Sequence, residues 1–246
     1  MKIYLRDRIL LALAVSVQGR AYPANRLWLW LPWKYSRRKF CQLTARLSRQ
    51  GIIERTVIEG EVNFRLASAG KKLLSARYPA FKWERPSWDG FWRLVTFDIP
   101  ESRRKERDEL RRRLIKLGFG ELQNSLYISA YDFPAGLLDW LWQKDLKENV
   151  FLMESKQKYL GEPKALARKV WRLEQLNYRY RQIVDKMATK FGIRGERKRL
   201  EFYKQAYEDF LEAVLNDPFL PKELLSSDWE GERARQFVLG AGAVRG

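Results

Sequence analysis

A short segment with two prolines, residues 77–87, divides the chain and limits what it can fold into. Pro79 and Pro86 each lack a backbone N–H and fix φ, so neither a helix nor a strand can run through this segment. The residues before the segment must therefore bury a core of their own, and a second fold begins after it. We predict three domains, at residues 1–78, 88–161 and 162–238.

The first segment is predicted to contain helices followed by a pair of strands. Ser36 is a favourable N-cap for a helix over 37–50, and Gly51 is a favourable residue to end it. Strands are expected over 52–58 and 62–66, joined by a tight turn that contains a glycine. Shorter helices are expected over residues 5–17, 25–31 and 69–74. This order, within fewer than about 80 residues, is typical of a winged helix-turn-helix domain.

Positive charge is concentrated in the same segment. Residues 1–80 contain 16 of the 48 lysines and arginines but only four of the 30 acidic residues, so they carry +12 of the net charge of +18. A polyanionic partner explains this concentration better than a general basic bias, which would spread the charge along the chain. We therefore predict that the partner is double-stranded DNA.

The exposed face of the helix over 37–50 is the expected DNA-reading surface. A major groove accepts one helix, whose first turns meet base edges while flanking cations hold phosphates. Arginine can pair with guanine and glutamine with adenine through two hydrogen bonds each. An ordinary solvated helix face is the alternative interpretation. The predicted DNA-binding residues are Ser36, Arg37, Arg38, Gln42, Arg46, Arg49 and Arg65, of which the last three are placed to meet the phosphate backbone.

Three tryptophans that precede this helix allow two interpretations. Trp28, Trp30 and Trp33 could form a stacking platform for single-stranded nucleic acid. Their neighbours Leu27, Leu29 and Leu31 are apolar, however, whereas stacking platforms interleave with basic residues. We favour packing in a core or against another domain.

The middle and last segments complete an α+β chain. Strands are expected over 91–99, 119–129 and 149–159, and helices over 103–117, with Ser102 as its N-cap, and over 132–147. This repeated strand–helix order predicts a ferredoxin-like domain. A long helix over 163–191 follows, with Leu166, Val170, Leu173, Leu176 and Tyr180 at spacings near three and four residues. Such a stripe is typical of subunit packing.

The composition leaves few enzyme classes open. The chain has no histidine and one cysteine, Cys41. It therefore lacks the commonest general base, and it cannot build an internal disulfide or a thiolate zinc site. The longest apolar run, Ile9–Val17, is too short to cross a bilayer. We expect a cytoplasmic protein that is not an enzyme, has no cofactor and has no membrane partner.

Two long and separated motifs resemble one family of regulators. The first is WDGFWRLVTFDIPE at 88–101, followed by RDELR at 107–111, LGFG at 117–120 and LYIS at 126–129. The second is DPFLPKELL at 217–225, followed by DWEG at 228–231. Together these motifs resemble PaaX-type transcriptional repressors over nearly the whole chain.

The resemblance implies a dimeric repressor of the phenylacetic acid degradation type. Its winged helix would bind a palindromic operator, and its middle domain would resemble a small CRISPR-associated nuclease of ferredoxin-like fold. Its helical C-terminal domain would assist dimerisation or respond to an effector. An acyl-coenzyme A thioester would release the DNA.

The same resemblance leaves a second function open. In the nuclease that the middle domain resembles, an aspartate that ends the first strand binds a divalent metal ion across the dimer axis, and Asp98 stands at that position. The alternative is therefore a Mg²⁺-dependent nuclease, or an adaptor in CRISPR spacer acquisition. In the simpler interpretation Asp98 ends a strand and hydrogen-bonds to the turn that follows.

Overall fold

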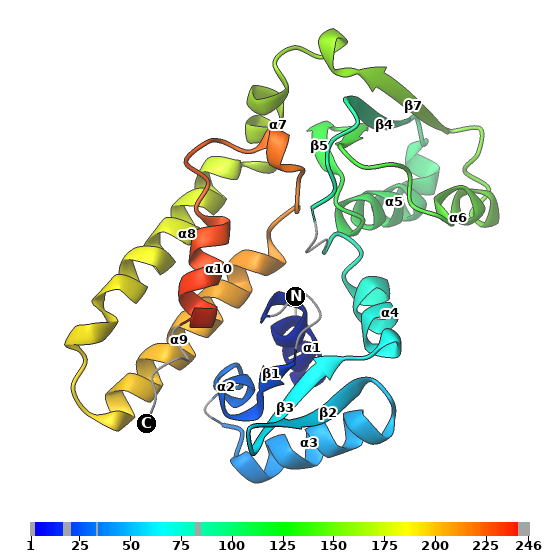
Figure 1. The fold of residues 1–246 in the computed structure, drawn as a ribbon. Helices are drawn as coiled ribbons and strands as arrows, with labels where there is room; N and C mark the ends of the chain where they lie inside the picture. Colours follow the sequence, from blue (N-terminus) through cyan, green and yellow to red (C-terminus); the bar gives the residue numbers. More distant parts are fainter. Residues whose placement is uncertain (1–2, 17–20, 33, 82–84, 241–246) are drawn as a thin grey trace. The chain divides into compact units, whose positions relative to one another are not determined.

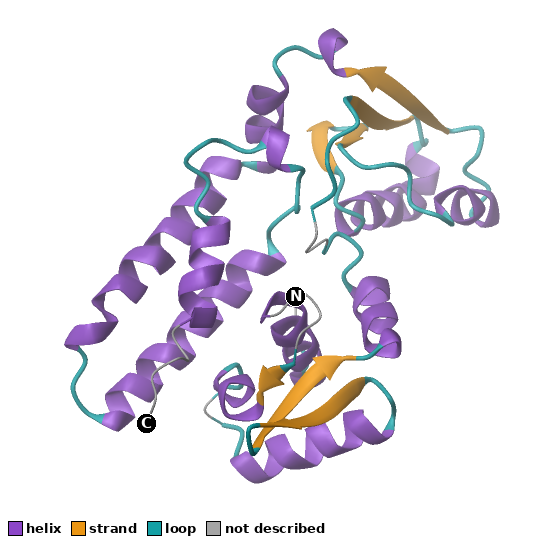
Figure 2. Cartoon of the chain, viewed as in Figure 1, coloured by secondary structure: helices purple, strands orange, loops and turns teal. Residues whose placement is uncertain are grey.

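The computed structural model describes residues 3–16, 21–32, 34–81 and 85–240 as a mixture of helices and small sheets (Figures 1 and 2). The predicted α+β class is confirmed. Contacts divide the chain into two compact units. Unit 1 comprises Met1–Arg77, Leu176–Asn216 and Trp229–Gly246, and unit 2 comprises Tyr78–Gln175 and Asp217–Asp228. The division into three domains stays a prediction. The two units are defined by contacts, and unit 1 contains the first segment and most of the third.

The N-terminal part of unit 1 is built from four helices and a three-stranded antiparallel sheet. In chain order its elements are α1 (Leu5–Ser16), β1 (Tyr22–Pro23), α2 (Ala24–Leu29), α3 (Arg37–Arg49), β2 (Ile53–Ile58), β3 (Glu61–Leu66) and α4 (Ser68–Arg77). The sheet order is β1-β3-β2. The predicted helices and the predicted pair of strands are present, whereas the two-residue strand β1 was not expected.

Helix α3 begins and packs as its sequence indicates. The Ser36 side chain accepts a hydrogen bond from the backbone N–H of Lys39 at 3.3 Å, which confirms the predicted N-cap. The buried face carries Phe40, Leu43, Thr44 and Leu47. The Phe40 ring meets the edge of Phe64 from β3, with ring centres 6.5 Å apart. The opposite face of α3 is therefore left for solvent or a partner.

Unit 1 also contains α8 (Leu173–Ala188) from Leu176 onward, α9 (Glu196–Leu215) and α10 (Gly231–Gly240). The single helix predicted over 163–191 is wrong. Helix α7 (Pro163–Trp171) ends at Arg172, whose left-handed backbone (φ 49°) breaks the helical path before α8 starts. In α8, Leu176 and Tyr180 are buried by packing within the chain. These two side chains therefore pack inside the chain, whereas the sequence predicted that they pack between subunits.

Unit 2 contains a four-stranded antiparallel sheet with two helices between its strands. In chain order its elements are β4 (Phe91–Phe97), α5 (Arg104–Lys116), β5 (Gly120–Gln123), β6 (Leu126–Ser129), α6 (Leu137–Gln143) and β7 (Val150–Lys156), followed by α7. The sheet order is β5-β6-β4-β7. Its core joins Val95 of β4 to Leu110 and Leu114 of α5 and to Leu141 of α6.

Three local predictions for unit 2 are wrong. The strand expected over 119–129 is a hairpin of β5 and β6, with a register irregularity between Glu121 and Gln123. The helix expected over 132–147 shortens to α6, which starts after Gly136 (φ 80°). Ser102 does not cap α5, because residues Glu101–Arg103 form a turn of 3-10 helix before it.

Candidate nucleic-acid interface

The exposed face of α3 carries a row of cations. Arg37, Arg38, Lys39, Arg46 and Arg49 are all exposed. Around the helix axis, at about 100° per residue, Arg38 and Arg49 occupy the centre of the exposed arc, with Gln42 beside them. Lys39 and Arg46 lie on one side of this centre and Arg37 on the other. Among the described residues, Arg38, Lys39, Arg46 and Arg49 have no ion-pair partner.

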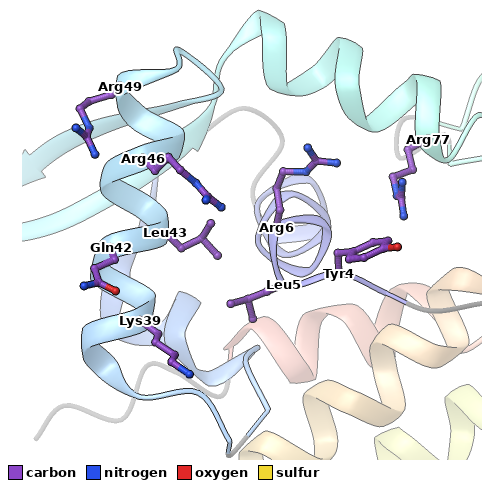
Figure 3. A pocket seen from close by; sticks show the side chains of 9 residues that line it. All are labelled: Tyr4, Leu5, Arg6, Lys39, Gln42, Leu43, Arg46, Arg49 and Arg77. Carbon is purple, nitrogen blue, oxygen red and sulfur yellow. The ribbon is translucent and has the colours of Figure 1, made fainter.

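One side of this row borders a groove of about 760 Å³, which we call the α1–α3 groove (Figure 3). Its lining residues are Tyr4, Leu5, Arg6, Lys39, Gln42, Leu43, Arg46, Arg49 and Arg77. In Figure 3 the Arg46 side chain extends from α3 toward α1, and Leu5 and Leu43 lie between the two helices. The lining thus combines five cations with a small apolar floor and includes no acidic side chain.

A buried carboxylate, that of Asp7, pairs with two of the lining arginines. Asp7 is 1% exposed, and it pairs with Arg77 at 2.5 Å and with Arg6 at 3.4 Å. The Arg77 guanidinium also lies 4.9 Å from the centre of the Tyr4 ring. One carboxylate is thus shared by two guanidinium groups, and the groove keeps an excess of positive charge.

The first turn of α3 is held from the other side by a tryptophan. The guanidinium carbon of Arg37 lies 4.9 Å from the centre of the Trp28 ring, and Lys204 Nζ of α9 lies 4.1 Å from the same ring. Lys204 is buried and donates a hydrogen bond to the Leu31 carbonyl at 2.6 Å. Burial lowers the pKa of Lys204 to about 8; the charge of Arg37 acts in the same direction, while Glu208 opposes it.

The other two tryptophans of this region are Trp30, which the structure describes, and Trp33, which it does not. Trp30 is 2% exposed and packs on Tyr207, with ring centres 4.6 Å apart, and on Phe210. Core packing, which the apolar neighbours favoured, therefore applies to Trp30. Trp33 lies outside the described residues.

Arg65 is on the strand pair rather than beside the groove. Its Nε donates to Glu54 Oε2 at 2.6 Å, across the β2–β3 pairing that places the two residues opposite each other. Both side chains are about half exposed. An exposed pair of this kind is worth only about 0.2–1 kcal/mol, so a phosphate could replace Glu54 as the partner of Arg65.

Asp98, the residue of the alternative metal site, is exposed just after β4. Its backbone N–H donates to the Asn149 carbonyl at 2.9 Å, and its carbonyl accepts from the Asn149 amide at 2.9 Å. Within the described ranges, no group of three or more acidic or cysteine side chains is arranged to hold a metal ion. The described helices also include none that is long and apolar enough to cross a membrane.

The structure thus places the seven predicted DNA-binding residues in four positions. Gln42, Arg46 and Arg49 lie together beside the groove, and Arg38 lies on the outer face of α3. Ser36 and Arg37 begin the helix, and Arg65 is on β3. Sequence reasoning missed Arg6, Lys39 and Arg77. Helical spacing from Gln42 and Arg46 could have found Lys39, but no sequence signal links Arg6 or Arg77 to α3.

Comparisons with known proteins match most of the chain. The family model described as "PaaX protein central Cas2-like domain" matches residues 85–167. The model described as "PaaX-like protein C-terminal domain" matches residues 171–242. "Transcriptional repressor PaaX" of Escherichia coli (strain K12) is 26% identical over an alignment of 212 residues, which covers 79% of this chain and 64% of that protein. The chain therefore spans somewhat less than two thirds of the relative it matches.

A solved structure agrees in fold with both units. The uncharacterized protein Rv0674 from Mycobacterium tuberculosis has a TM-score of 0.55 and 18% identity, and the alignment covers 94% of this chain and 93% of that one. At this identity the likeness concerns the fold alone. The two family models together match well over half of the residues, and the motifs at 88–101 and 217–225 fall within them. The chain belongs to the PaaX family.

Proposed function

We propose that this chain is a transcriptional repressor that binds double-stranded DNA in a sequence-specific manner, with α3 as the reading helix. The observation that carries the proposal is the row of exposed cations on α3 without acidic partners among the described residues. The name of the Escherichia coli relative, a transcriptional repressor, supports the same function. We do not assign an enzymatic activity to Asp98.

The arrangement of elements supports the domain types that DNA binding would use. Helices α1, α2 and α3 followed by the β2–β3 pair have the order of a winged helix-turn-helix, and β1 adds the short third strand. The sheet order β5-β6-β4-β7, with a helix before β5 and another before β7, fits a ferredoxin-like domain. We therefore propose a winged helix-turn-helix domain and a ferredoxin-like domain in this chain.

A homodimer is the proposed binding form. A two-fold dimer would present two copies of α3 to successive major grooves, about 34 Å apart on one side of the duplex, and its operator would be palindromic. The proposed effector, an acyl-coenzyme A-like molecule, would favour a dimer in which this spacing no longer matches the DNA. The helical C-terminal segment is the proposed dimerisation and effector region.

The experiment that tests the proposal starts from a random pool of duplexes. The full chain selects duplexes over several rounds, and fluorescence anisotropy then measures its affinity for a selected duplex and a scrambled one, with EDTA present. We expect tighter binding of the selected duplex, loss of affinity with rising salt, and intact DNA afterwards. Failure to retain any duplex at low salt would exclude the proposed function.

A further inference from the structure

The α1–α3 groove brings together cations from three helices that are distant in the sequence. Arg6 comes from α1, Lys39 from α3 and Arg77 from α4, and all three line the same hollow as Arg46 and Arg49. Lys39, Arg46 and Arg49 have no ion-pair partner in the part of the chain that the structure describes. Like charges gathered in one groove repel each other, so the arrangement is favourable when a polyanion lies among them.

The position of the groove beside the predicted reading face suggests which polyanion this is. A helix seated in a major groove points its outer face at base edges and its flanks at the backbone on either side. On α3 the outer face is centred on Arg38 and Arg49. Arg38, in the first turn, would face base edges, whereas Arg49, in the last turn, would lie beyond them and meet the backbone. The flank toward α1 carries Lys39 and Arg46. A sugar–phosphate strand passing this flank would lie along the α1–α3 groove.

The remaining lining of the groove agrees with a sugar–phosphate strand. Leu5 and Leu43 give the floor an apolar strip, which can contact sugar carbons but cannot neutralise the cations. Asp7 is buried against Arg6 and Arg77, so its carboxylate holds these two side chains without facing the groove. Tyr4 is 55% exposed, and its hydroxyl can donate a hydrogen bond to a phosphate oxygen.

We infer that the α1–α3 groove binds backbone phosphates of the duplex, with Arg6 and Lys39 as phosphate-binding residues beside Arg46 and Arg49. The inference rests on the proposed function and adds α1 to the DNA interface. Phosphate contacts carry no base information, so both residues contribute equally to the affinity for every duplex sequence. A free phosphorylated molecule offers the same chemistry, and the test separates it from DNA.

Charge-removing variants with matched controls test the inference. Arg6→Gln and Lys39→Gln are compared with Lys71→Gln and Lys72→Gln, which remove the same charge from exposed positions on α4 outside the groove. Anisotropy is measured on the selected and scrambled duplexes over a series of salt concentrations. Each groove variant should lower affinity for both duplexes by about fivefold at 0.15 M salt, and lower the slope of log K against log salt by about 0.9. Arg6→Lys, which keeps the charge, should bind as the wild type does.

Two results would overturn the inference while leaving the proposed function standing. In the first, the wild type binds DNA with normal salt dependence, and both groove variants match the α4 controls. In the second, tripolyphosphate binds the DNA-free protein in an Arg6-dependent manner, although Arg6→Gln leaves duplex binding unchanged, so that the groove is a site for small anions. If the wild type binds no duplex at all, the proposed function fails and the inference fails with it.

Discussion

The Lys204 ammonium nitrogen of α9 lies 4.1 Å from the centre of the Trp28 ring, and the Arg37 guanidinium lies 4.9 Å from the same ring centre. One aromatic ring thus connects a C-terminal helix to the first turn of the proposed reading helix. Cations near an aromatic ring gain about 0.5–2 kcal/mol, the larger values being for buried groups. Because Lys204 is buried, its protonation affects both the stability of unit 1 and the surroundings of Arg37.

The pKa of Lys204 predicts a rise in stability with pH. Burial lowers this pKa from 10.5 to about 8, so between these two pH values the unfolded chain holds one more proton than the folded chain. The free energy of unfolding should therefore increase as pH rises through this range, and Lys204→Met should lose the increase. Between pH 8 and 9.5 the difference between wild type and variant should change by on the order of 1 kcal/mol, measured by urea unfolding.

Lys72→Met is the control for this measurement, because Lys72 is exposed on α4. Its unfolding free energy should follow that of the wild type at every pH. Wild-type and Lys204→Met curves that run parallel from pH 8 to 9.5 would show that Lys204 does not titrate in this range.

Arg38 and Arg49 should differ in what they contribute to DNA binding. Arg38 is placed to read a base, so Arg38→Ala should cost about 1–3 kcal/mol on the selected duplex and relax the preference at one base step. Arg49→Ala should weaken binding to selected and scrambled duplexes alike. Repeating the duplex selection with each variant checks this prediction. A selected sequence that stays the same with Arg38→Ala would remove Arg38 from the reading face.

Glu54 should restrain DNA binding, because it pairs with Arg65. Glu54→Gln frees the guanidinium for a backbone phosphate. Duplex affinity should rise about 1.4- to fivefold, which corresponds to the 0.2–1 kcal/mol of an exposed ion pair. Anisotropy on one duplex at fixed salt measures the change, with Glu61→Gln as the control for loss of one negative charge from the same strand pair. Equal gains in both variants would mean that only net charge matters.

Gly120 should tolerate no side chain. A Cβ there would lie 2.1 Å from Val170 Cγ1 and 2.7 Å from Trp171 Cε2, so α7 would have to move away from β5. Gly120→Ala should destabilise the chain by on the order of 1–3 kcal/mol in urea unfolding followed by tryptophan fluorescence. Gly192→Ala adds the same methyl where no atom lies within 4 Å, and it should change stability by less than about 0.5 kcal/mol. Similar values for both variants would contradict the close packing.

The parts of the fold that the sequence predicted depend on local signals. Ser36 and the apolar spacing of Phe40, Leu43 and Leu47 define α3 within about 14 residues, and a turn with a glycine defines the β2–β3 pair. Pattern alone could not show that Arg172 would adopt a left-handed backbone, because non-glycine residues rarely do so. The hairpin within 119–129 was hidden for a similar reason, since its tight turn at Asn124 and Ser125 lacks glycine.

The candidate interface was predictable only along one helix. Gln42, Arg46 and Arg49 share a face by helical spacing, so the sequence could group them. Arg6 and Arg77 join them through tertiary packing of α1 and α4, and their shared partner Asp7 is adjacent to one of them and 70 positions from the other. Such contacts have no periodic signature, so the groove could be recognised only from the structure.

Unit 1 takes its residues from the beginning and from the end of the chain. The Lys204 bond to Leu31, the packing of Trp30 on Tyr207 and the ion pair of Arg8 with Glu208 at 2.6 Å all join residues more than 170 positions apart. During translation, residues 3–77 emerge long before α9 is made. Their core can therefore be completed only after most of the chain has been synthesised. A product released early by the ribosome would leave Trp30 without the rings of Tyr207 and Phe210 that cover it, and its core would stay incomplete.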